Sequence, residues 1–196
     1  GASQALGIRM AENFDTPFFA SSVSEYWRRW HITLGTWMKE YVFYPVLKSE
    51  WWIRIGEKAR KRLGKKRGKK VPTYLGMFVL WFTVGMWHGG AWKYIIGSGL
   101  LHCFYIVAGQ MLEPAFTKTA RLLRVNTQCW SWRLFQGLRT FFLVCIGFVF
   151  FRASSAGDAV RMFKASLAFN PWIFTDGSLL HLGLDAQDFT VGLLSL

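Results

Sequence analysis

Apolar residues are concentrated in a few long runs of this 196-residue chain, and these runs carry almost no charge. Between Val71 and Leu112 the only formal charge is Lys93. A helix needs about 20 mainly apolar residues to cross a bilayer, so this run predicts two membrane spans. The run 134–151 predicts a third, because its one charge, Arg139, lies near enough to its start to reach lipid headgroups. Residues 189–196 are interpreted as the start of a fourth.

A different pattern occupies residues 21–47. Ser22 followed by Glu25 fits a capping box at a helix start. Apolar and aromatic residues then recur every three or four positions, which predicts a helix with one aromatic face. They are Trp27, Trp30, Leu34, Trp37, Met38 and Tyr41. Because cations occupy its other face, we expect this helix to lie at a membrane interface.

Positive charge is concentrated in residues 48–72, which hold 11 of the 24 Lys and Arg against two acidic residues. Nucleic-acid binding is one interpretation of such a run. A cytoplasmic loop is the better one, because short loops rich in Lys and Arg next to a span stay inside. The same rule places 113–133 inside, and the more acidic stretch after the third span outside.

Composition adds little to this pattern. A net charge of +13 with 52% hydrophobic and 18% aromatic residues is compatible with several classes of protein. The chain lacks a C-x-x-C pair, a phosphate-binding glycine loop and a G-x-S-x-G motif. We therefore expect neither a disulfide nor a bound metal. The predicted fold is an all-α membrane protein, a multi-span helical bundle or ring with interfacial amphipathic helices.

The expected organisation is one partial domain over residues 1–196. It comprises the interfacial helical region 21–47, the basic loop 48–72, two membrane helices around a Gly-Gly break in 73–112, the span 134–151 and the truncated span 189–196. Since the chain opens on Gly1 and ends inside an apolar run, we expect it to be an interior piece of a larger protein, inactive alone.

The stretch WFTVGMWHGGAW places His88 at the end of an apolar run. Ionisable groups within a membrane are costly and tend to be functional. Burial disfavours the charged imidazole, so His88 would stay neutral and able to accept a proton. Gly85, Gly89 and Gly90 favour either a break in the backbone or close packing between helices. Both interpretations remain open at this point.

Two motifs resemble the membrane-bound O-acyltransferase family. They are WRRWHITLGTWMKEYVFYP and VGMWHGGAWKYIIGSGLLH, and the flanking NFDTPFFASSVSEYW and FVFFRASS are also similar. The chain looks closest to the bacterial branch of alginate O-acetyltransferases and the proteins that pass D-alanine to teichoic acids. Family members are about twice as long, so the N-terminal part and the extreme C-terminus are expected to be missing. The resemblance implies a ring of spans and tilted helices around a tunnel.

The resemblance also implies site residues. His88, in W-H-G, maps onto the position regarded as catalytic. His31, in W-R-R-W-H, maps onto a second position, with chemical and positioning roles both open. His102 matches a further recurrent position. It would lie ~21 Å from His88 along one continuous helix, so a supporting role is expected. Substrate-binding or supporting roles are expected for Trp30, Trp87, Gly89, Gly90 and Trp92. His181 matches nothing and is assigned to a solvated loop.

The implied reaction moves an acyl group, acetyl or else D-alanyl, from a thioester to a hydroxyl. The donor would be acyl-CoA or an acyl carrier protein, with no cofactor bound. The acceptor would be a cell-envelope or exported polysaccharide or a teichoic acid, aided by a periplasmic or surface acyltransferase partner. The expected location is the bacterial cytoplasmic (inner) membrane, with several passes through the lipid bilayer and no nucleic acid bound.

Two other classes remain open. A transporter or flippase subunit would use intramembrane histidines as a proton relay, and inverted repeats, which are not visible here, would favour it. A non-catalytic membrane scaffold would leave His31 and His88 without a purpose.

Overall fold

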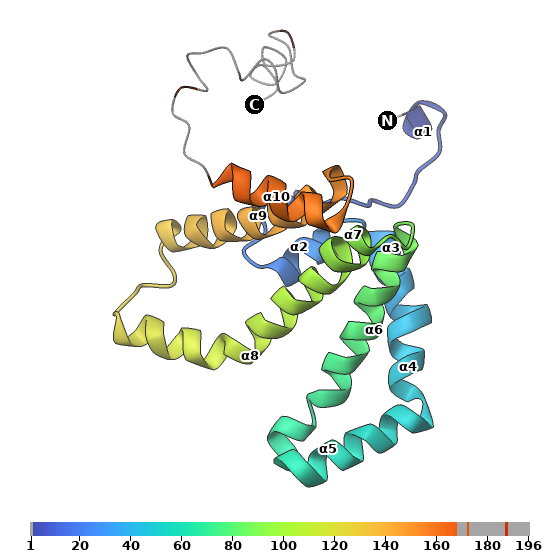
Figure 1. Cartoon of the computed structure of the whole chain (residues 1–196), viewed down its shortest axis with the longest axis vertical. Helices are drawn as coiled ribbons and strands as arrows, with labels where there is room; N and C mark the ends of the chain where they lie inside the picture. Colours follow the sequence, from blue (N-terminus) through green and yellow to red (C-terminus); the bar gives the residue numbers. More distant parts are fainter. Residues whose placement is uncertain (1, 168–171, 173–186, 188–196) are drawn as a thin grey trace. The chain divides into compact units, whose positions relative to one another are not determined.

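The computed structural model describes residues 2–167, 172 and 187, and this part of the chain is built from helices and turns, with one isolated bridge between Phe14 and Trp30 (Figure 1). This confirms the expected all-α class. The elements in chain order are α1 (Ala2–Ala5), the 3-10 helix η1 (Pro17–Phe19), α2 (Val23–Arg29), α3 (Ile32–Met38), the π-helix η2 (Lys39–Phe43), α4 (Tyr44–Lys48), α5 (Glu50–Gly68), α6 (Val71–Trp87), α7 (Trp92–Tyr94), the π-helix η3 (Ile95–Leu100), α8 (Leu101–Leu122), α9 (Trp130–Arg152) and α10 (Ala156–Ser166).

The chain divides into two compact units, Gly1–Val160 and Arg161–Leu196. The elements discussed below belong to the first unit. The expected start of a fourth span at 189–196 and the loop assigned to His181 lie outside the described residues.

Residues 21–47 form a series of short helices, so the prediction of one continuous amphipathic helix is wrong. The capping box is present, because the Glu25 backbone N–H donates to the Ser22 hydroxyl at 3.1 Å. The first helix nevertheless ends before His31, whose backbone is left-handed at φ 50°, ψ 53°. The break divides the aromatic face. Met38 is buried, whereas Trp37 and Tyr41 are 50% and 65% exposed.

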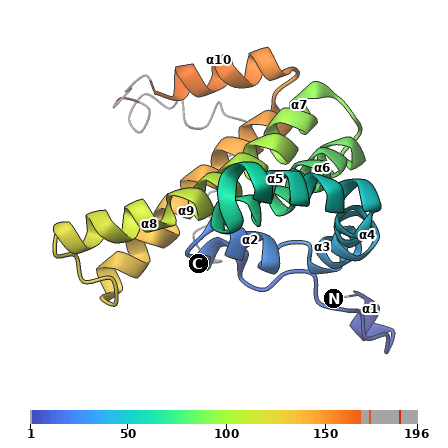
Figure 2. The ribbon, with the colours of Figure 1, turned by 90° about the horizontal axis from the view of Figure 1, so that it is seen from below.

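The basic segment 48–72 is mostly helical and does not form an irregular loop. Lys, Arg and Glu have high helix propensity, and they dominate α5. Gly64 interrupts the helix at φ 76°, a conformation that favours glycine. Figure 1 shows α5 crossing the ends of α4 and α6, and in Figure 2, seen from below, it lies in front of α6.

Gly89 and Gly90 reverse the chain between α6 and the run α7–η3–α8. Their φ values are 118° and 73°. The returning run packs against α6, and two other glycines allow the approach. A Cβ on Gly85 would lie 2.6 Å from the Ile95 Cα, and one on Gly99 would lie 2.5 Å from the Trp81 carbonyl oxygen. The glycines of this region therefore include two at the break and two at the packed interface.

Two described helices are long and apolar enough to cross a bilayer: Trp92–Leu122 and Trp130–Arg152. The second contains the expected span 134–151. The first continues beyond the expected end at Leu112, so that part of the segment predicted as the loop 113–133 is helical. Its residues include Ala, Lys and Arg, which favour helix. The apolar helix α6 has 17 residues, which corresponds to about 26 Å.

The helix α2 packs between the α6–α8 hairpin and α9. One core cluster joins α2, α3, α6 and α8, and its buried members are Val23, Met38, Trp81, Val84, Cys103 and Ile106. A second joins Tyr26 of α2 to Val144 of α9. The Arg139 guanidinium also donates to the Ser21 carbonyl at 2.9 Å. These contacts fix the position of the WRRWH segment relative to the W-H-G segment.

Candidate active site

His88 caps the C-terminus of α6, directly before the chain reverses. Its backbone N–H donates to the Val84 carbonyl at 3.2 Å, which completes the last turn. The imidazole is half-buried among three aromatic rings. Its ring centroid lies 4.7 Å from that of Trp87, 4.9 Å from that of Phe151 and 6.2 Å from that of Tyr94. At the break in the chain, the His88 imidazole is therefore surrounded by aromatic side chains.

Burial lowers the pKa of His88 below its ordinary value of 6.5, and the nearby charge of His31 lowers it further. Both effects disfavour the imidazolium form of His88, since burial removes hydration and positive charge nearby is repelled. The imidazole is therefore neutral near pH 7, as a proton acceptor must be.

His31 lies at the junction of α2 and α3, and the upstream segment holds that junction in place. The Ile32 N–H donates to the Asn13 carbonyl at 3.0 Å. The Thr33 N–H and hydroxyl both donate to the Asn13 side-chain oxygen, at 3.1 and 2.6 Å. Asn13 thus satisfies the first amide groups of α3 from 20 residues away, in the manner of an N-cap.

The ring of Trp87 contacts both histidines. Its centroid lies 5.7 Å from that of His31 and 4.7 Å from that of His88. The His31 Nδ1 atom is buried, with no hydrogen-bond partner among the residues that the structure describes. The fold thus brings together the two histidines of the separate motifs, across one tryptophan.

His102 lies elsewhere. It is 3% exposed, and its ring packs against Trp27 at 5.0 Å and Trp81 at 5.9 Å. Trp81 precedes His88 by seven residues, which is about 10 Å along α6. Gly147 of α9 leaves room for the His102 ring, because a Cβ there would lie 2.6 Å from Nε2. His102 is therefore packed into the core between α2, α6 and α9. It contacts α6 about two turns before His88.

The expected supporting residues have different environments. Trp30 stacks on Tyr26 at 5.6 Å and meets the edge of Phe14 at 4.9 Å, so its ring is built into the core. Trp92, the first residue of α7, is 70% exposed. Gly89 and Gly90 form the reversal itself.

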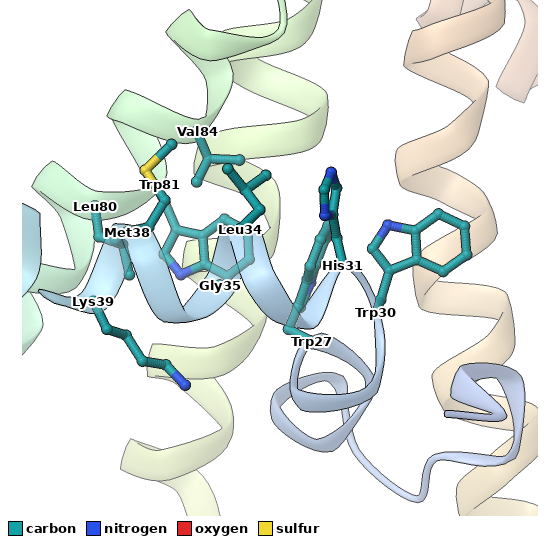
Figure 3. Close-up of a pocket in the computed structure, with 10 residues that line it drawn as sticks. All are labelled: Trp27, Trp30, His31, Leu34, Gly35, Met38, Lys39, Leu80, Trp81 and Val84. Atoms are coloured by element: carbon teal, nitrogen blue, oxygen red, sulfur yellow. The ribbon is translucent and has the colours of Figure 1, made fainter. Parts of the chain in front are cut away.

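A small cavity of about 80 Å³ opens beside His31 (Figure 3). Its walls are mainly apolar and come from α2, α3, η2 and α6. They are formed by Trp27, Trp30, His31, Leu34, Gly35, Met38, Lys39, Leu80, Trp81 and Val84. In Figure 3 Lys39 and His31 lie at opposite sides of the group of lining residues. The cavity offers an imidazole in apolar surroundings, and it is smaller than the several hundred Å³ typical of a ligand pocket.

Sequence reasoning gave no role to several residues that shape this site. Phe151 and Tyr94 contact His88, and Asn13 holds the junction at His31. Phe151 and Asn13 fall inside the FVFFRASS and NFDTPFF stretches, which resemble the family. That resemblance marked the stretches but did not indicate what either residue contacts. Among the described residues, no group of three or more His, Cys, Asp or Glu could hold a metal ion.

No protein-family model matches the chain. Curated proteins do. A "Probable alginate O-acetylase AlgI" of Pseudomonas syringae pv. tomato is 33% identical over 197 residues, which is all of this chain and 32% of that protein. The "Peptidoglycan O-acetyltransferase" of Helicobacter pylori is 28% identical over 96% of the chain and 30% of its own length. The "Teichoic acid D-alanyltransferase" of Bacillus subtilis is 32% identical over 77% of the chain and 34% of its own length. The chain thus spans about a third of the length of these relatives.

Proposed function

The chain belongs to the membrane-bound O-acyltransferase family, and on this premise we propose that the protein transfers an acyl group from a thioester to a hydroxyl of a cell-envelope polysaccharide. The observation that carries the proposal is the position of His88. It is a half-buried imidazole at a chain reversal, surrounded by aromatic rings, with His31 on the other side of Trp87.

His88 acts as the general base in this proposal. Its neutral imidazole accepts the proton of the acceptor hydroxyl while the oxygen attacks the thioester carbonyl. When the carbon–sulfur bond breaks, the imidazolium returns the proton to the departing thiolate. No other acid or base is needed for the cycle to balance.

His31 has a positioning or electrostatic role in the proposal. An imidazole N–H aimed at the carbonyl oxygen would stabilise the negative charge that develops there. Trp87 contacts both histidine rings, so it lies between the proposed general base and the group proposed to stabilise the carbonyl oxygen. Trp30, Trp92, Gly89 and Gly90 shape the surroundings. His102 supports them from the core by holding Trp27 and Trp81.

We further propose acetyl as the acyl group, because the alginate O-acetylase relative matches the chain from end to end. The donor is acyl-CoA or an acylated carrier protein and approaches from the cytoplasmic side, where the basic helix α5 attracts anionic groups. The acceptor polysaccharide approaches from the outer side, and a periplasmic or surface acyltransferase completes the modification. The chain is a membrane protein, and we place it in the bacterial inner membrane with several spans.

The direct test is His88→Ala in the full-length protein, expressed in cells that lack the natural copy. Loss of a general base lowers a rate by about 10²- to 10⁴-fold, so ester-linked acyl groups on the envelope glycan should fall to background. Ester content of purified glycan is the measurement, and immunoblotting verifies equal amounts of protein in the membrane.

His181→Ala is the matched control, since no site role is assigned to His181. It should leave ester content unchanged. Normal ester content in the His88→Ala cells, at equal protein level, would contradict the proposal.

A further inference from the structure

The helix α5 and the two residues after it carry a dense cluster of cations, to which the proposed reaction gives only a general attraction for an anionic donor. Between Lys58 and Lys70, nine of 13 residues are Lys or Arg, and this stretch contains no acidic residue. Within the described part of the chain, the ion pair of α5 is Arg54 with Glu50, at 3.6 Å on an exposed surface. The charge of the segment Lys58–Lys70, here called the basic cluster, is therefore not neutralised by the described residues of this chain.

The backbone compacts this cluster. Gly64 interrupts the helix at φ 76°, and the chain then turns back on itself. Gly68 packs so closely against the part of α5 before Gly64 that a Cβ on it would lie 2.5 Å from the Ala59 carbonyl oxygen. The cations after Gly64 therefore lie beside those before it. Such an arrangement concentrates like charges, which repel one another, and an anionic surface would relieve that repulsion.

The same helix also exposes large apolar side chains. Trp51 is 65% exposed, Ile53 50% and Leu63 54%. Cations combined with exposed tryptophan and aliphatic side chains are typical of helices that lie in a membrane interface.

Packing attaches α5 to the end of an apolar helix. The Trp52 indole N–H donates to the Pro72 carbonyl at 2.9 Å, and Gly56 lies against the Pro72 ring. Pro72 belongs to the first turn of α6. Figure 2 shows α5 lying across α6. An element that crosses the end of an apolar helix in this way is placed at the level of lipid headgroups.

We propose that α5 and its basic cluster form a binding surface for anionic phospholipid headgroups, such as those of phosphatidylglycerol. Lysine and arginine near a membrane surface attract anionic lipid, and the effect sums over the cluster. The exposed apolar side chains favour a lipid surface over an acidic protein or a nucleic acid. The inference goes beyond the proposed acyl transfer and depends only on the chain being a membrane protein.

The test uses the full-length protein, purified in a neutral detergent and incubated with phosphatidylglycerol or phosphatidylcholine. Bound phospholipid per protein after repurification is the measurement. The variant is Lys61→Gln/Arg62→Gln/Lys65→Gln/Lys66→Gln, because glutamine keeps helix propensity while removing four charges. Its matched control removes four charges from α8, α9 and their connection: Lys118→Gln/Arg121→Gln/Arg124→Gln/Arg133→Gln.

The unsubstituted protein should retain phosphatidylglycerol in preference to phosphatidylcholine, and raised salt should weaken the preference. The α5 variant should lose at least about tenfold in affinity for phosphatidylglycerol, and the control variant less than about threefold. Equal retention of the two lipids by the unsubstituted protein, or equal losses in both variants, would overturn the proposal. Displacement by soluble glycerol phosphate at matched concentration would also overturn it, as would loss of binding to an acidic carrier protein with lipid retention unchanged.

These readouts do not depend on catalysis. A protein that retains phosphatidylglycerol through α5 but transfers no acyl group would contradict the proposed function alone. A protein that transfers acyl groups without this lipid preference would contradict the α5 proposal alone.

Discussion

At the scale of single residues, the protonation of His88 depends on two neighbouring influences. Burial among Trp87, Tyr94 and Phe151 disfavours the imidazolium, and the charge of His31 disfavours it further. A base must be unprotonated, so activity is lost as pH falls through the pKa of His88. Because that pKa is below 6.5, we expect the midpoint of the fall in acyl-transfer rate to lie below pH 6.5. A pH–rate profile of the full-length protein in proteoliposomes measures this. A fall centred at or above pH 6.5 would contradict it.

His31→Gln tests the second influence. The substitution removes the electrostatic effect of His31, which lowers the pKa of His88, so that pKa rises and the acidic limb of the profile moves to higher pH. The midpoint of the limb is the informative quantity, since the overall rate also falls if His31 positions substrate. His102→Gln is the comparison variant, because His102 is not among the causes that lower the pKa of His88, so the midpoint should stay where it is. An unchanged midpoint in His31→Gln would show that the two imidazoles do not interact.

At the scale of elements, the junction of α2 and α3 depends on Asn13. Asn13→Ala removes the oxygen that accepts from the Thr33 N–H and hydroxyl, and we expect a loss of about 1 kcal/mol, as for an N-cap. Acyl transfer should fall as well, because His31 is positioned by the same junction. Asn13→Asp keeps an acceptor oxygen and should retain most of both. Thermal unfolding in detergent and ester formation are the measurements. Similar behaviour of the two variants would exclude a capping role.

The hairpin of α6 and the run α7–η3–α8 depends on close backbone approach. Gly99→Ala would place a Cβ 2.5 Å from the Trp81 carbonyl oxygen, and overpacking of this kind costs about 1–3 kcal/mol. Gly109→Ala, in the same helical run, meets nothing within 4 Å and should be neutral or stabilising by up to about 1 kcal/mol. The free energy of unfolding of the full-length protein distinguishes them. Equal effects would mean that η3 and α6 are not closely packed.

Some features of these helices could be predicted from the sequence, and others could not. The Ser22–Glu25 capping box and the Gly89–Gly90 break follow from local chemistry, and both are present. The break at His31 was missed, because a left-handed histidine is uncommon and the apolar spacing continues through it. The break is held by hydrogen bonds from Thr33 to the Asn13 side chain, and the spacing of apolar residues cannot predict such a long-range contact. The contact of Phe151 with His88 likewise depends on how α9 packs against the hairpin.

At the scale of the whole molecule, charge and hydrophobicity are separated along the chain. The basic helix α5 precedes the apolar helix α6, and basic residues also cluster around the connection between α8 and α9: Lys118, Arg121, Arg124 and Arg133. The family resemblance and the apolar helices were recognisable from sequence, because both are local patterns. The contact of both histidine rings with Trp87 was not, because it requires the junction of α2 and α3 to pack against the end of α6.

This separation of charge predicts the sidedness of the protein, and cysteine labelling in whole cells tests it. Cys129 is a natural reporter for the connection between α8 and α9. The hydroxyl of Ser131 lowers the pKa of the Cys129 thiol, which favours the reactive thiolate. With every other cysteine replaced, Cys129 should react with a membrane-impermeant maleimide only after permeabilisation, because positively charged connections stay inside.

A second reporter, Ser154→Cys in a protein without Cys129, follows the end of α9. The 23 residues of α9 extend about 35 Å, enough for one crossing of the bilayer, so this position should react in intact cells. Lys61→Cys in α5 should behave like Cys129. Labelling of Cys129 and Ser154→Cys from the same side would contradict a crossing by α9. It would also remove the basis for a donor and an acceptor that reach His88 from opposite faces.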